Sequence, residues 1–291
     1  MNRVVNISTT AWSEEQSSAR CQQAIEALED GKVLFLPQLR FELDEAERVF
    51  LQPVMKGNRK NISYDIATGE VRGGVMEANE EARLRAMMYR FARSARDLIG
   101  SLLPRYETGL LQGRTSFRPV EIVGRVSSWR QDDTRLHVDS FPSSPVQGKR
   151  ILRVFSNVNP SGRNRSWRIG EPFETVARRY LPSIPGPIWG GSQLMQWSRI
   201  TKSRRSPYDH FMLKLHDRMK SDLDYQKTAE QIGFEFPPGS TWLVYTDQVS
   251  HAAMAGQHSF EQTFYVPISS MANAAKSPLR ILERINGAAL V

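Results

Sequence analysis

The stretch that decides the fold is Leu136–Ser140 (LHVDS), read together with the later run Thr246–His251 (TDQVSH). In an extended segment, residues i and i+2 point to the same side, so His137 and Asp139 are expected to lie together. His251 follows a strand-like run much further along the chain. Two imidazoles and one carboxylate form the facial triad that binds Fe(II) and leaves coordination positions open. The sequence therefore predicts a metal site made by His137, Asp139 and His251.

The His-x-Asp pattern is a weak signal on its own. With five histidines and 31 acidic residues, about half a match per chain is expected by chance. The position of both halves of the pattern beside strands favours the metal site. The alternative is that Asp139 caps a turn and that His251 is an ordinary core histidine. His210 and His216 are six residues apart on one expected helix, so they lie on different faces and are interpreted as helix residues without a metal.

The chain around this motif is rich in short strands. Turn signals such as Asn159-Pro-Ser-Gly162 and Pro237-Pro-Gly239 separate these runs. The helices do not alternate with the strands as they would in a parallel doubly wound sheet. This order favours a β-sandwich or open barrel with helical additions. The expected strands are Glu121–Val126, Arg150–Val158, Thr241–Thr246 and Gln262–Val266, and the expected helices are Pro172–Tyr180 and a segment that begins after Ser206 and ends near Lys220.

The first third of the chain is expected to be mainly helical. A capping box at Ser13 and Gln16 predicts a helix that Asp30-Gly31 ends, before a short strand at Val33–Leu36. A second helix is expected near 44–51. The clearest helix is 79–102, because its apolar residues recur every three or four positions. That stripe consists of Leu84, Met88, Phe91, Ala95, Leu98 and Leu102. We expect one domain over 1–291, with helical support in 1–104, a β core in 105–270 and a tail in 271–291.

Composition narrows the function classes. The chain has 40% hydrophobic and 24% charged residues, which is typical of a soluble globular protein. Its single cysteine, Cys21, excludes an internal disulfide and a cysteine-based zinc cluster, and its place on a helix stripe makes thiol catalysis unlikely. No signal peptide, membrane span, nucleotide-binding glycine loop or nucleophile elbow is found. The net charge of +8 favours polyanionic partners, or it is simply that of a basic enzyme.

The pattern of His137, Asp139 and His251 resembles the iron/2-oxoglutarate-dependent oxygenases. Within that superfamily, three runs are similar to the Kdo (3-deoxy-D-manno-oct-2-ulosonic acid) hydroxylases, over roughly residues 116–267. These runs are Arg135–Pro145 (RLHVDSFPSSP), Arg150–Pro160 (RILRVFSNVNP) and Trp242–Val266. The resemblance implies an α+β fold with a double-stranded β-helix (jelly roll, cupin-like) core, N-terminal supporting helices and helical insertions.

The resemblance also implies an activity. Such an enzyme uses Fe(II), 2-oxoglutarate and O2, with ascorbate as a reductant in vitro, and forms succinate and CO2. It would hydroxylate C3 of a Kdo sugar on Kdo-lipid A, an anionic glycolipid, in lipopolysaccharide inner-core modification. We expect a cytoplasmic enzyme, with possible peripheral contact on the inner face of the inner membrane and no nucleic acid partner. The alternatives are an oxygenase with a protein or another small-molecule substrate, and a non-catalytic basic β-fold that binds polyanions.

The sequence departs from the superfamily pattern at the position expected to bind the co-substrate. Most members carry Arg or Lys ten or eleven residues after the distal histidine to bind the far carboxylate of 2-oxoglutarate, but Glu261 and Gln262 stand there. Arg153 alternates with apolar neighbours on a strand, and a planar guanidinium suits a carboxylate, so we assign this role to Arg153. Arg150 and Lys149 are the fallback candidates, and the alternative is that Arg153 is a structural residue.

Basic loops are the expected binding site for the sugar substrate. The segment Arg163–Arg168 (RNRSWR) is interpreted as a loop at the mouth of the barrel, where Arg163, Arg165 and Arg168 bind the sugar carboxylate or lipid phosphates. A second cluster is Lys202–Arg205. The alternative for each cluster is ordinary solvated charge.

Overall fold

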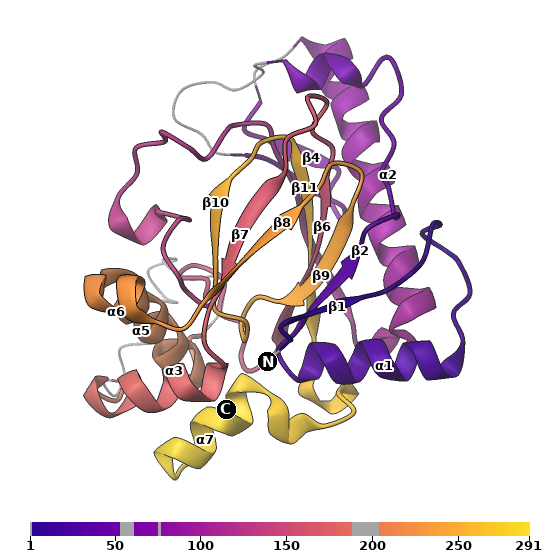
Figure 1. Cartoon of the computed structure of the whole chain (residues 1–291). Coiled ribbons are helices and arrows are strands. Elements are labelled where there is room, and N and C mark those ends of the chain that lie inside the picture. Colours follow the sequence, from indigo (N-terminus) through magenta and orange to yellow (C-terminus); the bar gives the residue numbers. More distant parts are fainter. Residues whose placement is uncertain (1, 53–60, 75–76, 188–203) are drawn as a thin grey trace.

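Two β-sheets of unequal size form the centre of the protein. The computed structural model describes residues 2–52, 61–74, 77–187 and 204–291. The large sheet has the order β1-β2-β9-β6-β11-β5-β3-β4, and the small sheet has the order β10-β7-β8 (Figure 1). The large sheet consists of β1 (Val4–Asn6), β2 (Val33–Leu36), β3 (Ile62–Asp65), β4 (Glu70–Arg72), β5 (Leu111–Arg118), β6 (Arg150–Asn157), β9 (Thr241–Tyr245) and β11 (Ser259–Val266). The small sheet consists of β7 (Arg165–Ile169), β8 (Ile232–Phe236) and β10 (His251–Ala255).

The pairing is antiparallel throughout, apart from the parallel pair β1–β2. Because side chains alternate along a strand, each sheet has one face toward the other sheet and one face away from it. Trp167 and Phe236 of the small sheet meet Phe155 and Trp242 of the large sheet between the two layers. This arrangement is a jelly roll, and the fold class expected from the sequence is confirmed.

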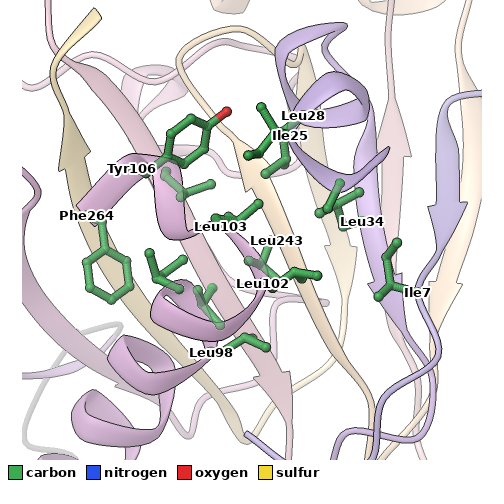
Figure 2. Packing of buried hydrophobic residues seen from close by; sticks show 14 of the residues in the cluster. Ile7, Ile25, Leu28, Leu34, Leu98, Leu102, Leu103, Tyr106, Leu243 and Phe264 are labelled. Carbon is green, nitrogen blue, oxygen red and sulfur yellow. The ribbon is translucent and has the colours of Figure 1, made fainter. Parts of the chain in front are cut away.

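Helices cover the outer face of the large sheet. They are α1 (Ser18–Glu29) and α2 (Ala78–Leu102). The stripe expected on α2 is fully buried, and Leu98 and Leu102 pack with residues of β9 and β11, as Figure 2 shows. At about 25 cal/mol per Å² of apolar surface removed from water, this layer is a major source of folding free energy.

A second group of helices packs beside the small sheet. It consists of α3 (Phe173–Tyr180), α5 (Pro207–Ser221), α6 (Leu223–Thr228) and α7 (Pro278–Asn286). Apolar residues of α3, α5 and α7 share one buried cluster with Leu136 and Val138, which flank His137. The metal motif is therefore held by the core on both sides of the histidine.

The start of α5 matches its prediction. Ser206 is the N-cap, Pro207 follows it, and Asp209 closes a capping box with Ser206. The Asp209 carboxylate also accepts from the backbone N–H groups of Val146 and Gln147, at 2.8 and 3.1 Å. The cap thus joins α5 to the segment before β6.

Replacing Ser206 by alanine is expected to lower the free energy of unfolding by about 1 kcal/mol, because one backbone N–H at the helix start loses its acceptor. Urea unfolding measures the change. Ser221→Ala at the other end of α5 is the matched control, since its hydroxyl only donates to the carbonyl of Arg218. Equal stability of the two variants would contradict this role of the cap.

Several local predictions for the N-terminal part need correction. The N-cap of α1 is Ser17, whose side chain accepts from the Arg20 N–H, and not Ser13. The segment 44–51 forms turns and one 3₁₀ turn, η1 (Arg48–Leu51), because capping contacts between Asp44 and Glu47 close it early. The strands β1–β4 lie within 1–104 and join the large sheet, so this part is less helical than expected. The expected tail 271–291 contains α7.

The β core also differs in detail. The strand expected at Glu121–Val126 is wrong, because Gly124 has a φ of 79° and a turn forms there instead. The preceding strand, β5, was not predicted, because its polar residues hide its alternation. The loop expected over 163–168 is wrong from Arg165 onward, where β7 begins. Leu136–Ser140 is extended but forms only an isolated bridge, between His137 and His251.

Within the described segments, no helix is long and apolar enough to cross a membrane.

Candidate metal centre

Three side chains converge at one edge of the small sheet. One potential ligand atom each from His137, Asp139 and His251 lies within 4.8 Å of the other two, and all three residues are buried or nearly so. The Nε2 atom of His137 is 3.6 Å from Oδ1 of Asp139, and the two imidazole centroids are 4.6 Å apart. The convergence expected from the sequence is therefore present.

Backbone pairing brings the three residues together. His137 and His251 exchange N–H···O bonds of 3.0 and 2.9 Å, and the N–H of Asp139 donates to the carbonyl of Thr246 at 2.7 Å. His251 opens β10, which pairs with β7. The distant segments thus meet through a short antiparallel bridge, whose register sets which side chains face each other.

The imidazoles are oriented by backbone carbonyls. Nδ1 of His137 donates to the carbonyl of Arg135, and Nδ1 of His251 donates to the carbonyl of Val249, each at 2.8 Å. A carbonyl can only accept, so both protons lie on Nδ1 and both Nε2 lone pairs are free to bind a metal. Such outer partners commonly fix the tautomer of metal-binding histidines.

The protonation states suit a cation. Burial lowers the pKa of His137 to about 3 and also lowers the pKa of His251, so both rings are neutral at pH 7. Burial alone would raise the pKa of Asp139, but Arg153 and the two histidines outweigh it and hold that pKa well below its usual range. Two neutral imidazoles and one carboxylate at this spacing fit a single divalent transition metal such as Fe(II).

Arg153 lies on the inner face of β6, as its alternation with Leu152 and Val154 predicted. Its Nη2 is 3.0 Å from Oδ2 of Asp139, and its Nη1 is 2.8 Å from Oε1 of Glu261. Among the described residues, its buried Nε has no hydrogen-bond partner. The guanidinium therefore keeps one donor for another acceptor in the interior.

Glu261 and Gln262 point to opposite sides of β11. Glu261 faces the interior and pairs with Arg118, at 3.0 and 2.7 Å from Nε and Nη2, as well as with Arg153. Burial opposes the charge of Glu261, but these two arginines lower its pKa. Gln262 is buried on the other face of β11, away from the barrel interior, and its side-chain oxygen accepts from the hydroxyl of Thr115 at 2.6 Å. Arg or Lys was expected at this position from the superfamily pattern. Glu261 stands there instead, and its carboxylate binds two interior arginines.

Arg118 belongs to the same interior but was not identified from the sequence. It ends β5, and Arg114, Ser116 and Arg118 alternate along that strand. This two-residue period of polar residues is the sequence signal that could have identified both β5 and Arg118.

The three arginines proposed for substrate binding occupy different places. Arg165 is buried, donates to the carbonyl of Gly256 at 2.7 Å, and has its pKa lowered to about 9 by burial and then by the charge of Arg118. Arg163 is exposed before β7. Arg168 is three residues after Arg165 on the same strand and binds the carbonyl of Thr134 at 2.6 Å. Strand alternation therefore puts Arg165 and Arg168 on opposite faces of β7.

Aromatic and basic groups complete the surroundings of the two histidines. The ring of Trp167 stacks on His251, with centroids 5.1 Å apart. His216 meets His137 edge-to-face at 5.3 Å, and its Nδ1 is 3.1 Å from Oδ1 of Asp217. His216 is thus a neighbour of the metal motif, contrary to its interpretation as an ordinary helix residue. His210 is bound instead to the carbonyl of Pro185 at 2.9 Å.

The fallback candidates lie elsewhere. Arg150 is on the other face of β6 from Arg153, where its guanidinium pairs with Asp247. Lys149 precedes β6 and is half-buried. In the second basic cluster, residues 202 and 203 lie outside the described residues, and Arg205 binds the carbonyl of Pro142 at 2.7 Å.

Comparisons with known proteins agree with this geometry. Residues 11–289 match the family model of 3-deoxy-D-manno-oct-2-ulosonic acid (Kdo) hydroxylase. The chain is also similar to crystal structures of the Kdo hydroxylase KdoO, described as a non-heme Fe(II) alphaketoglutarate dependent dioxygenase. The complexes with alphaketoglutarate and Fe(III), with succinate and Fe(III), and with cobalt(II) share 46% identity with it, at TM-scores of 0.95, 0.95 and 0.96. Each match covers 99% of this chain and 97% of the other.

A comparison with curated protein sequences found no match. The family model spans nearly the whole chain, and the matched crystal structures share its full architecture. The chain belongs to the Kdo hydroxylase family.

Proposed function

We propose that this protein is an Fe(II)/2-oxoglutarate-dependent dioxygenase that hydroxylates C3 of a Kdo sugar on Kdo-lipid A. The observation that carries the proposal is the buried triad of His137, Asp139 and His251 beside Arg153, whose Nε remains available. Family membership supports the Kdo sugar, and the related KdoO structures with Fe(III) and alphaketoglutarate support the cofactors.

The triad would hold a bound Fe(II), with His137 and His251 offering Nε2 and Asp139 offering a carboxylate oxygen. Fe(II) with 2-oxoglutarate, when bound, supplies the activation of O2 that replaces a C–H hydrogen by hydroxyl and leaves succinate and CO2. The chain itself orients the ligands through the carbonyls of Arg135 and Val249, and the ring of Trp167 covers one face of the His251 imidazole.

The charge of the interior suits 2-oxoglutarate. Arg118, Arg153 and Arg165 are set against the carboxylates of Glu261 and Asp139, which leaves an excess of positive charge before a divalent metal adds more. A buried excess charge is costly unless a counter-ion balances it. The dianion of 2-oxoglutarate balances it, with its far carboxylate on Arg153 and with Arg118 and Arg165 nearby.

Replacing Arg153 by lysine is expected to raise the KM for 2-oxoglutarate roughly 10- to 100-fold, the cost of a lost charge-assisted hydrogen bond, with a smaller effect on kcat. Lysine keeps the positive charge beside Glu261 and Asp139 but lacks the planar fork. Succinate formation against 2-oxoglutarate concentration measures the effect. Arg178→Lys, at an exposed ion pair with Glu174 on α3, is the control and is expected to keep the wild-type KM. An unchanged KM in Arg153→Lys would remove this residue from the co-substrate site.

The substrate is tested directly. The protein is incubated with a Kdo-bearing lipid A precursor, Fe(II), ascorbate, 2-oxoglutarate and O2, and the lipid is analysed by mass spectrometry. The proposal requires a mass gain of one oxygen atom that depends on 2-oxoglutarate. Succinate formation without lipid oxidation would favour an oxygenase with another small-molecule or protein substrate. If neither succinate nor oxidised lipid forms, and the protein binds polyanions in a salt-dependent way, a non-catalytic basic fold is favoured.

The three arginines assigned to substrate binding have different roles in this proposal. We propose that exposed Arg163 binds a phosphate or sugar carboxylate, that buried Arg165 supplies positive charge in the interior, and that Arg168 binds substrate from the outer face of β7. The location expected from the sequence, in the cytoplasm or at the inner face of the inner membrane, stays a prediction.

A further inference from the structure

An apolar loop projects from the barrel close to the metal motif. This loop, residues 119–128, connects β5 to the 3₁₀ turn η3 (Trp129–Gln131), and His137 follows shortly after. Two of its side chains are unusually open to solvent, with Val126 at 97% and Val123 at 66% exposure. In Figure 1 the loop is the pink segment on the side of the barrel away from α2.

Buried contacts anchor both ends of the loop. The Glu121 carboxylate accepts from the N–H groups of Ile122 and Gly256, at 2.8 and 2.6 Å. The side chain of Ile122 is buried in the cluster between the sheets. Arg125 donates to the Asp133 carboxylate at 2.6 Å. The loop that carries the two valines is therefore held in place at both ends.

A tight turn points the tip outward. The N–H of Arg125 donates to the carbonyl of Ile122 at 3.1 Å, and Gly124 takes a φ of 79° that suits the third position of a type II turn. Ile122 thus points inward while Val123 stands at the tip. Moving apolar side chains out of water is favourable, so two exposed valines on a fixed loop suit contact with an apolar layer.

Next to the loop, η3 and α5 carry exposed basic residues, and η3 also carries Trp129. The guanidinium of Arg130 lies 4.1 Å from the ring of Trp129, and its side chain is 61% exposed. Lys214 and Arg218 are exposed one turn apart on α5, the helix that packs against η3. Asp217 on the same helix pairs with Arg130 at 3.3 Å, so the nearest helical carboxylate is already neutralised.

We propose that the loop docks on an anionic lipid surface, with Val123 and Val126 at the boundary between headgroups and acyl chains. Trp129 would lie at headgroup level, and Lys214 and Arg218 would face lipid phosphates. This inference rests on the proposed function, because a lipid-borne sugar must be reached at a membrane. A series of ion pairs connects the loop to Asp139 of the metal centre: Arg125 with Asp133, Asp133 with Arg118, Arg118 with Glu261, and Arg153 with both Glu261 and Asp139.

Vesicle flotation tests the docking. The full chain is expected to bind vesicles of phosphatidylethanolamine with phosphatidylglycerol, to bind phosphatidylcholine vesicles less, and to release with added salt. Val123→Asp with Val126→Asp is expected to weaken binding at least about tenfold, because two apolar contacts become charges. Lys214→Glu with Arg218→Glu is expected to remove the preference for anionic lipid. Val291→Asp is the matched control, because Val291 is as exposed as Val123 and lies at the end of the chain after α7.

The outcomes separate docking from catalysis. The Val123→Asp/Val126→Asp variant is expected to keep the wild-type unfolding midpoint and to hydroxylate substrate dispersed in detergent as wild type does, but to be slower on substrate in vesicles. Wild-type vesicle binding by this variant would overturn the proposal, as would no vesicle binding by the wild type. Loss of self-association instead of vesicle binding would assign the loop to a contact between copies. Failure of hydroxylation with intact vesicle binding would overturn only the proposed function.

Discussion

Replacing His137 or Asp139 by alanine is expected to abolish stable iron binding and to lower 2-oxoglutarate turnover by more than about 100-fold. Changes to outer partners of metal ligands already cost up to about that factor, and these residues would be ligands themselves. Both side chains lie within the 4.8 Å cluster with His251, so the loss of either leaves only two donors. Iron content after anaerobic loading and succinate formation measure the two effects.

The control for this experiment is His210→Ala. This histidine binds the Pro185 carbonyl and takes no part in the cluster, so iron content and turnover are expected to stay at the wild-type level. Near-ultraviolet circular dichroism checks that each variant is folded. Wild-type iron content and turnover in both His137→Ala and Asp139→Ala would show that the triad is not the metal site.

Replacing Arg150 by methionine is expected to lower the free energy of unfolding by about 3–5 kcal/mol, because it leaves the buried Asp247 without its partner. The guanidinium of Arg150 is fully buried, 2.8 and 3.3 Å from the two oxygens of Asp247, and it also donates to Gln248 at 2.6 Å. Burial raises the pKa of Asp247 in spite of the arginine, which shows how costly its charge would be alone.

The same substitution is expected to weaken the metal site. Arg150 ties down the segment between β9 and β10, where Thr246 accepts from the Asp139 N–H and Val249 orients His251. Iron affinity should therefore fall in Arg150→Met even where the protein remains folded.

Urea unfolding and iron titration measure these two effects. Arg163→Met, at an exposed site, is the control and is expected to change neither. The double variant Arg150→Met/Asp247→Leu is expected to recover much of the lost stability, because no charge is left buried. A loss below about 1 kcal/mol in Arg150→Met, the value of a surface ion pair, would contradict the role of the pair.

Much of the helical layer and of the metal motif could be predicted from local patterns. The stripe from Leu84 to Leu102 identifies α2, because a helix of this length keeps its apolar residues on one side whatever it packs against. The pairing of Ser206 with Pro207 identifies the start of α5. The proximity of His137 and Asp139 follows from the geometry of an extended chain.

The missed strands show where local patterns fail. In β5 the inner face carries Arg114, Ser116 and Arg118, and the other face mixes Thr115 with Phe117, so hydrophobic alternation gives only a weak signal. In β7 the two arginines Arg165 and Arg168 resemble a solvated loop, although one is buried and the other is on the opposite face. Strands that line a charged interior lack the composition by which strands are usually identified.

The sequence by itself determined the residue types of the site, the helical stripe and the side of β6 to which Arg153 points, because these depend on neighbours a few positions away. Only the tertiary structure decided that a backbone bridge joins His137 to His251, that Glu261 binds Arg118 and Arg153, and that Arg150 lies behind the site rather than in it. The physical reason is that strand partners distant in sequence are chosen by the packing and hydrogen bonding of the whole sheet, and a shift of one residue in register would turn each of these side chains to the other face.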